Sequence, residues 1–251
     1  MTDAVDALRA DSAALVSAAR TFSPEQWATP SSCAGWAVQD VVAHMSALWL
    51  QLTDPGSLPP GDPSGSIERT QDRWVESMRG QSGEEVLAAY EANAGNAIPT
   101  LETLRGNETP IDLGDLGTHP LSLIANAYSF DHFTHLRADI LGPIGPVGSA
   151  PEWDALRLGP AMDWMIAGIP QMCTEALAAV DGPVILDLTG PGGRATTFPS
   201  GAEAGDAARV TTSTADFVLW GTQRRDWRDL DVQLDGDVVR ATTFCDAIRI
   251  F

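Results

Sequence analysis

The chain has 251 residues, and its 34 acidic residues against 15 basic ones give a formal net charge of −19 at pH 7. Such a surface repels phosphate groups, which argues against nucleic acid and against an anionic membrane as a partner. All the basic residues are arginines. A lysine Schiff base and a Walker-type phosphate loop are therefore excluded.

The cysteines and the N-terminal residues indicate the cellular compartment of the protein. Cys33, Cys173 and Cys245 are too few and too scattered for a disulfide framework or a zinc ribbon. The first residues include acids where a secretory signal would be basic, and no apolar run approaches ~18 residues, the length of a membrane span. We therefore expect a cytoplasmic protein.

Apolar periodicity predicts that the first part of the chain is helical. A first helix is expected over residues 2–22, capped by Thr2 or Asp3. A second, over 36–52, follows a loop, and Ser82 with Glu85 reads as a capping box. The remaining predicted helices cover 66–79, 83–104, 121–141 and 153–180. The Pro- and Gly-rich segment 54–65 is expected to be an exposed loop.

The pattern changes to short β-type runs at residue 182. Strands are expected over 184–189, 195–198 and 208–212, the first two forming a hairpin, and a helix capped by Ser213 should run to about residue 221. Residues 231–240 read as a strand and a tight turn. The fold class is therefore a helical domain, residues 1–165, followed by a small α+β domain, residues 166–251.

The stretch from Ala127 to Ile140 carries the clearest chemical signal. If it is helical, Asp131 and His135 are four residues apart and lie on one face. A carboxylate and an imidazole at that spacing can hold two positions of one divalent metal, although a solvated ion pair is the commoner meaning of the same pattern. His44, on the apolar face of the helix 36–52, would supply a third ligand; its alternative is a core histidine with one hydrogen bond.

The other two histidines are expected to be exposed. His119 lies in the polar loop 106–120 and is predicted to be on the surface. His132 should point away from the face that carries Asp131 and His135 and be exposed, or serve as an alternative ligand if the helix is rotated.

Two further stretches resemble a known family. Trp27 to His44, WATPSSCAGWAVQDVVAH, resembles the signature of the mycothiol-dependent maleylpyruvate isomerase family, which is part of the DinB-like metalloprotein superfamily. The sequence FVLWGTQRRDW from Phe217 to Trp227, with Asp235-Gly-Asp237 after it, is similar to the C-terminal region of that family. The motifs occur in the right order and separation, so the resemblance covers nearly the whole chain.

The resemblance implies a DinB-like four-helix bundle followed by a sterol-carrier-like α+β domain. It also implies that His44 is a metal ligand, because the histidine that ends the signature has that role in the family. The other two family ligands are a glutamate and a histidine four residues later, and Asp131 and His135 occupy their places. The thiol cosubstrate would be mycothiol, the small thiol of actinobacteria.

The chain departs from the family pattern at three positions. Asp131 stands where glutamate is usual, so its shorter arm must reach by a backbone shift or bind through water. An aspartate three residues after the last histidine is common in the family, and here that position is Ala138, with Asp139 next to it. Gln223 stands where the family has a glycine before its two arginines. These departures leave the particular substrate open.

A site of this kind would leave positions on the metal free, as in catalytic rather than structural sites. A thiol bound there would lose its proton and add to an electrophile, for cis–trans isomerisation or for S-transfer. Asp40, one turn before His44, could fix the tautomer of that imidazole. Arg224 or Arg225 could clamp a substrate carboxylate, the alternative being surface arginines paired with nearby aspartates.

Three function classes therefore remain. The first is a metal- and mycothiol-dependent isomerase or transferase, the second a non-catalytic binding protein for an apolar ligand, and the third a thiol-independent metal hydrolase. Two histidines and a carboxylate suit zinc first, with nickel, iron or manganese as alternatives. The expected partners are a small thiol and an electrophile, and the protein should be a monomer or a homodimer.

Overall fold

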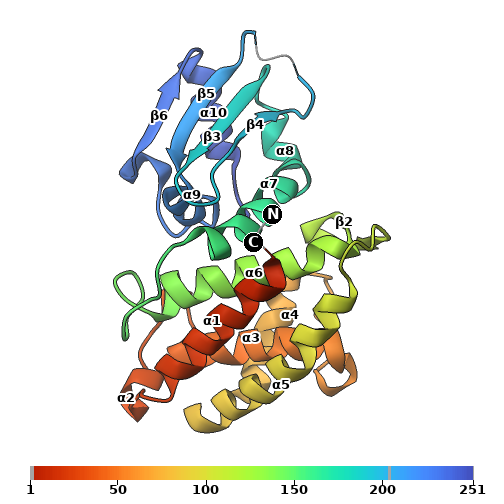
Figure 1. Cartoon of the computed structure of the whole chain (residues 1–251), viewed down its shortest axis with the longest axis vertical. Coiled ribbons are helices and arrows are strands. Elements are labelled where there is room, and N and C mark those ends of the chain that lie inside the picture. The colour runs from red at the N-terminus through yellow and green to blue at the C-terminus, as the bar shows by residue number, and fades with distance from the viewer. Residues whose placement is uncertain (1–2, 203–204, 251) are drawn as a thin grey trace.

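The computed structural model describes residues 3–202 and 205–250 of the chain. The first domain is a bundle in which four long helices run roughly along one another, below the second domain in Figure 1. These helices are α1 (Ala4–Ala19), α3 (Val38–Thr53), α5 (Gly83–Thr103) and α6 (Ile124–Thr134), and α2 (Pro24–Trp27) and α4 (Ile67–Met78) lie beside them. The helical first domain that the sequence predicts is confirmed.

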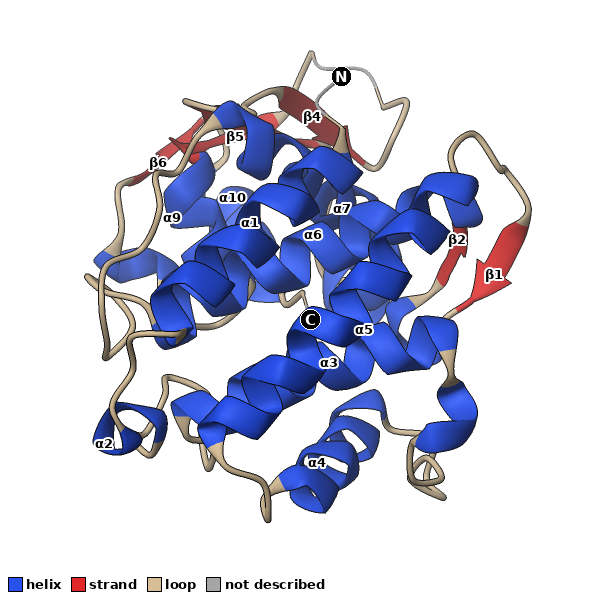
Figure 2. Ribbon diagram, turned by 60° about the horizontal axis from the view of Figure 1, so that its bottom comes forward, coloured by secondary structure: helices blue, strands red, loops and turns tan. Residues whose placement is uncertain are grey.

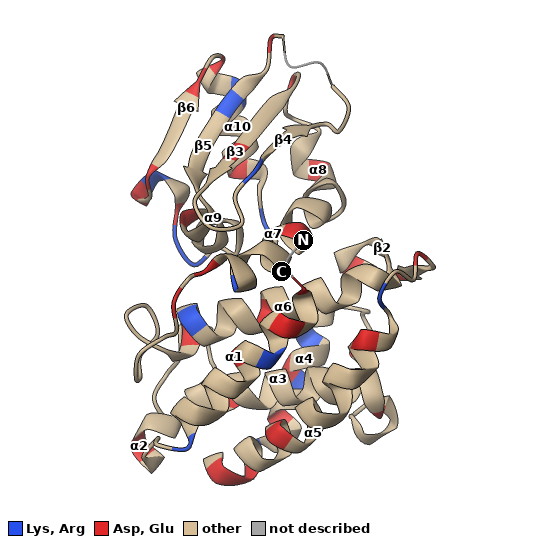
Figure 3. Cartoon of the chain, viewed as in Figure 1, with Lys and Arg blue, Asp and Glu red and all other residues tan. Residues whose placement is uncertain are grey.

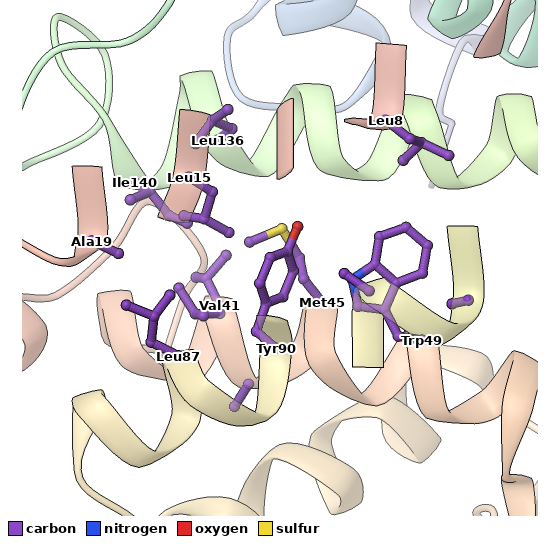
Figure 4. Packing of buried hydrophobic residues seen from close by; sticks show 14 of the residues in the cluster. Leu8, Leu15, Ala19, Val41, Met45, Trp49, Leu87, Tyr90, Leu136 and Ile140 are labelled. Atoms are coloured by element: carbon purple, nitrogen blue, oxygen red, sulfur yellow. The ribbon is translucent and has the colours of Figure 1, made fainter. Parts of the chain in front are cut away.

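Apolar side chains from all sides fill the centre of the bundle. Leu15 of α1, Met45 and Trp49 of α3 and Tyr90 of α5 lie close together in Figure 4, and none is more than 1% exposed. Burying side chains of this size contributes about 1.5–3 kcal/mol each. This core aligns α3 against α5, which fixes the position of His44 on α3.

Polar caps define where the helices begin. The side chain of Asp3 accepts from the backbone N–H of Val5 at the start of α1; Thr2, the alternative cap, lies outside the described residues. Ser82 and Glu85 form the predicted capping box at the start of α5. Each such cap satisfies backbone N–H groups that have no partner inside the helix, and is worth about 1 kcal/mol.

The predicted helix 121–141 begins as α6 but changes its geometry before it ends. From His135 to Ile140 the backbone is a π-helix (η4), and the N–H of Leu141 bonds to the carbonyl of Leu136, five residues back. Such wide turns are frequent at functional sites. The helix is therefore continuous, as expected, but its last turns are wound more loosely than an α-helix.

Helix α6 separates two cores. Leu136 and Ile140 belong to the bundle core, whereas Phe130 and Phe133 belong to a second core shared with the sheet. Figure 1 shows α6 crossing the middle of the molecule between the bundle and the second domain. Side chains on α6 and η4 can therefore reach both domains.

Helix α7 (Ala155–Met172) joins the two domains without a break and is followed by α8 (Thr174–Leu177). The expected boundary between residues 165 and 166 falls inside α7. Trp164 and Met165, just before this boundary, are buried in the second core. Helix α7 therefore packs against the sheet of the second domain as well as against the bundle.

The second domain is a four-stranded sheet covered on one face by helices. Its order is β4-β3-β5-β6, with β3 parallel to β5 and antiparallel to β4, and β5 antiparallel to β6. Its strands are β3 (Val184–Thr189), β4 (Ala195–Phe198), β5 (Ala208–Ser213) and β6 (Val232–Asp235), and α9 (Thr214–Gly221) follows β5. Val184, Leu186 and Leu188 alternate with less buried residues, as expected for a sheet with one covered face.

Two elements differ from the sequence prediction. The strand and turn predicted over 231–240 are present as β6 and the turn at Gly236, whose φ is 74°, but residues 238–240 instead begin α10 (Val238–Ala247), because Asp237 caps the helix. The loop 106–120 contains a short hairpin of β1 (Pro110–Asp112) and β2 (Thr118–Pro120), at the right of Figure 2. The short 3-10 helices are η1 (Pro55–Ser57), η2 (Gly114–Leu116), η3 (Leu121–Leu123) and η5 (Trp227–Asp229).

A buried ion network joins α1 to the later helices. Asp11 accepts two bonds from Arg137, at 3.0 and 2.8 Å, and a third from Arg157 at 2.8 Å. The side chain of Arg137 has no exposed surface and that of Asp11 is 2% exposed. A charge buried this deeply is tolerated only with a partner, so the network fixes α1 against η4 and α7.

Most of the other charged residues lie on the surface, where acidic residues outnumber basic ones over the face shown in Figure 3. Within the described residues, every helix is too short or too polar to cross a bilayer.

Replacing Asp11 by alanine should destabilise the protein by about 3 kcal/mol, because it leaves the buried Arg137 guanidinium without its carboxylate. Urea denaturation measures the change. The matched control is Arg9→Ala, which removes an arginine of the same helix whose ion pairs with Asp6 and Glu102 are exposed. The control should lose at most about 1 kcal/mol. An Asp11→Ala loss no larger than that of the control would contradict the role given to the network.

Candidate metal centre

Three side chains from separate elements meet at the junction of the domains. His44 comes from α3, Asp131 from α6, and His135 is the first residue of η4. The distance from Nε2 of His44 to Oδ1 of Asp131 is 3.1 Å, and that from Nε2 of His135 to the same oxygen is 3.4 Å. One ligand atom from each of the three lies within 4.8 Å of the other two. The sequence analysis predicted that these three side chains lie at one site.

The spacing of these atoms suits a small cation. Two nitrogen or oxygen ligands that bind a tetrahedral zinc ion at 2.0–2.1 Å are about 3.3 Å apart. The aspartate arm is long enough to reach both imidazoles, although glutamate was the residue expected here. Oδ2 of Asp131 is buried and has no hydrogen-bond partner in the described part of the chain. The donor set of two imidazoles and one carboxylate therefore fits a divalent metal.

The charges of the three groups depend on one another. Burial alone would raise the pKa of Asp131, but the nearby charges of His135 and His44 and their hydrogen bonds hold this pKa well below its ordinary value. Burial would lower the pKa of His135, but Asp131 and hydrogen bonds to Asp131, Asp139 and Cys33 raise it well above the usual range. An anionic carboxylate thus lies against a protonated imidazole, and a cation bound at this site would displace that proton.

The opposite edge of the His135 ring faces a second group of side chains. Nδ1 of His135 is 2.7 Å from Oδ2 of Asp139, and Sγ of Cys33 lies 3.8 Å from the same nitrogen. Arg224, from the loop after α9, donates through Nε to Oδ1 of Asp139 at 2.9 Å and through Nη2 to its Oδ2. Burial would raise the pKa of Asp139, but the hydrogen bonds and charges of His135 and Arg224 lower it strongly.

The loop that carries Cys33 is attached to η4. The hydroxyl of Ser32 donates to the carbonyl of Ala138 at 2.9 Å. Trp36 ends this loop, its ring 5.2 Å from that of His44 and its Nε1 bonded to Asp72. The family-like signature before His44 therefore forms one wall of the site.

Asp40 does not have the predicted contact with His44. Its Oδ2 accepts from the backbone N–H of Ala37 at 2.9 Å, and its Oδ1 accepts from Nε of Arg79 at 3.3 Å. Nδ1 of His44 is buried without a hydrogen-bond partner among the described residues. The expectation was wrong because Asp40 is the third residue of α3, where free backbone N–H groups compete for its carboxylate.

Both remaining histidines are buried, and the prediction that they are exposed was wrong. His132 is 2% exposed and packs against Trp49 at 4.4 Å between ring centroids, and burial lowers its pKa to about 4. His119 is also 2% exposed and packs on Trp164 at 4.6 Å. His132 is buried because α6 has cores on two sides, so the face away from the ligands also points into protein.

The two arginines proposed as substrate clamps lie in different places. Arg224 is part of the cluster, with its guanidinium on Asp139. Arg225 is exposed and lines a cavity of about 300 Å³ together with Trp227 and Asp246, a cavity that none of the three candidate ligands lines. Of the two, only Arg224 contacts the candidate metal centre.

The sequence reasoning missed Asp139 and Cys33 as members of the site. Asp139 follows His135 by four residues, the same spacing that singled out Asp131 and His135, so the signal was present. Cys33 lies 102 residues before His135 in the chain, and their contact depends on how loop and helix pack. Local patterns carry no information on such a pair.

Gln223 has an unusual backbone that directs Arg224 toward the site. Its φ is 59°, in the left-handed region that favours glycine, which is the residue expected in the family. Its side-chain Nε2 donates to the carbonyls of Trp220 and Ile248, at 3.1 and 2.9 Å. These two bonds stabilise the strained turn.

Comparison with known proteins supports the resemblance. Residues 6–109 match the family model described as mycothiol maleylpyruvate isomerase N-terminal domain. Two solved structures, of a mycothiol-dependent maleylpyruvate isomerase and of a mutant described under the same name, have TM-scores of 0.59 and 0.58. Each is 16% identical, over 92% of this chain and 91% of the other. No curated protein matches the chain. The two-part fold and the family resemblance predicted from the sequence are confirmed, and they support the expectation of an enzyme.

Gln223→Gly and Gln223→Ala should differ in stability. Both variants lose the side-chain hydrogen bonds to the carbonyls of Trp220 and Ile248. Alanine at this position still has the steric penalty of a left-handed backbone, whereas glycine adopts this conformation freely. The glycine variant should therefore be more stable than the alanine variant by about 1 kcal/mol in urea denaturation. Equal stability, or a more stable alanine variant, would show that the turn is not strained.

Cys33 should be the first cysteine to react with iodoacetamide in the folded protein. It is half-buried, whereas Cys173 and Cys245 are 3% and 1% exposed. Burial also raises the pKa of the Cys173 thiol, and that of the Cys245 thiol to about 12. Mass spectrometry of digested protein would locate the label, with Cys33→Ser as the control. Label on Cys173 or Cys245 before Cys33 would contradict this packing.

Proposed function

We propose that this chain, whose residues 6–109 belong with the mycothiol maleylpyruvate isomerase N-terminal domain family, is a metal-dependent enzyme that uses mycothiol. The thiol would add to a small electrophile, either to isomerise a cis double bond or to form a stable S-conjugate. The observation that carries the proposal is the meeting of His44, Asp131 and His135 at the junction of the two domains.

The ligand set favours catalysis over a structural metal. Three protein ligands leave room for a further ligand, whereas structural zinc sites are closed by four protein side chains. A divalent cation held there would lower the pKa of a thiol bound to it, so that the thiol would react as a thiolate. The protein's own contribution is to place one anionic carboxylate between two imidazoles, which balances part of the charge of the cation.

Neighbouring residues control access to the candidate ligands. The ring of Trp36 covers one side of His44 and shields it from water. Cys33 and Arg224 border His135, and Arg224 is only 19% exposed.

Isomerisation and S-transfer share their first step. The sulfur forms a bond to one carbon of the electrophile, and the electron pair moves onto the acceptor. In isomerisation, the former double bond is now a single carbon–carbon bond and can rotate; the electron pair then returns, the double bond re-forms in the trans arrangement, and the C–S bond breaks to release the thiol unchanged. In transfer, the C–S bond is kept, a proton is taken up, and the conjugate leaves. The solved relatives are described as maleylpyruvate isomerases, which favours testing isomerisation first.

Elemental analysis of untagged protein tests the metal site. We expect about one equivalent of a divalent metal, zinc in the first instance, in the parent protein. His44→Ala and His135→Ala should each lose it while the circular dichroism spectrum stays that of the parent. His119→Ala, which removes a buried histidine away from the ligands, is the matched control and should keep its metal. A parent that binds no metal even after reconstitution would contradict the proposal.

Turnover assays separate the three function classes. The metal-loaded protein should convert maleylpyruvate, or conjugate an epoxide or quinone, only when mycothiol is added. Activity without thiol would instead identify a hydrolase. Tight binding of an apolar ligand without turnover would identify a binding protein.

A further inference from the structure

The protein holds its two candidate imidazole ligands in different ways. Nδ1 of His135 donates to Asp139, whereas Nδ1 of His44 has no hydrogen-bond partner among the described residues. An imidazole whose Nδ1–H is held by a carboxylate presents Nε2 to a cation in a fixed tautomer and orientation, and is more basic. The strength of the site should therefore depend more on the partner of His135 than on any group near His44.

Asp139 can act in this way only if its own charge is compensated. The carboxylate has no exposed surface, and its side-chain partners in the described chain are His135 and Arg224. An imidazole that binds a cation is itself uncharged. The guanidinium of Arg224 is then the group of the protein that compensates the buried carboxylate.

The N–H donors of Arg224 are arranged to compensate and orient the carboxylate of Asp139. Nε and Nη2 form a two-pronged contact with Asp139, and Nη1 donates to the carbonyl of Thr222 at 3.3 Å. The strained turn at Gln223 directs the side chain from the second domain toward η4 of the first. A forked contact fixes the carboxylate in orientation as well as in charge.

We propose that Arg224 is a positioning residue for the metal: through Asp139 it orients His135, so that a contact from the second domain sets the metal affinity of a site on the first. This inference rests on the proposed metal-dependent function. It assigns Arg224 a task that precedes substrate binding and can be measured without substrate.

The test is the zinc affinity of the full-length protein, measured by competition with a chromophoric chelator. Arg224→Met should weaken zinc binding about tenfold, and Asp139→Asn by between about tenfold and a hundredfold. Two controls should stay within about twofold of the parent: Arg225→Met, in the exposed neighbouring arginine, and Asp40→Asn, in the acid that caps α3. Arg224→Met with the affinity of the parent would overturn the inference.

A double variant separates action through Asp139 from a separate effect. If Arg224 acts through Asp139, Arg224→Met with Asp139→Asn should bind zinc no more weakly than Asp139→Asn alone. Losses that multiply would overturn the inference. The double variant also removes both charges together, so it keeps the comparison usable if Arg224→Met alone fails to fold with an uncompensated buried carboxylate.

A measurement without metal distinguishes this inference from the function on which it rests. The chain has four histidines, so single variants can assign their ring protons by NMR. The Nδ1 proton of His135 should exchange slowly with water in the metal-free parent, and about tenfold faster in Arg224→Met but not in Arg225→Met. If the parent binds no zinc, the proposed function fails, and this exchange rate alone decides whether Arg224 holds His135. An unchanged rate would overturn the inference.

Discussion

The carboxylate of Asp139 has no contact with solvent, and the arrangement around the candidate metal centre follows from its need for compensating charge. It pairs with the imidazole of His135 from the bundle and with the guanidinium of Arg224 from the second domain. The nearby pair of Asp11 and Arg137 repeats this solution on the other side of η4. Buried charges thus specify how the bundle, the π-helix and the second domain fit together, while the apolar cores supply most of the stability.

Much of the fold could be predicted because its signals are local. The period of apolar residues located the helices of the bundle, and short β-type runs located β3 and β5. The candidate ligands His44, Asp131 and His135 were identified by spacing and by resemblance, without knowledge of the packing. The predicted strand and turn over 231–240 are followed by a helix sooner than expected, also for a local reason: Asp237 is a helix cap, and its effect prevailed over the β propensity of Val238 and Val239, which are 53% and 77% exposed.

The rest could not be predicted because it depends on contacts between distant segments. His132 looked exposed on a helix with one buried face, but α6 has a core on each side. Asp40 had the right spacing to orient His44, but its carboxylate accepts a hydrogen bond from the free backbone N–H of Ala37 instead. Arg224 meets Asp139 across 85 residues of sequence. Pattern reasoning proposed which residue types do chemistry, and tertiary packing decided which of them meet.

Because α7 runs without a break from one domain into the other, it limits where recombination could exchange the two domains. A recombination point at residues 165 and 166 would split the helix next to Trp164 and deprive the sheet of part of its own core. Exchange of the second domain between relatives would have to take α7 with it, starting in the loop before Ala155. Even then the incoming domain would need an arginine placed to meet Asp139. The two halves are therefore expected to diverge together, as one evolutionary unit rather than as interchangeable modules.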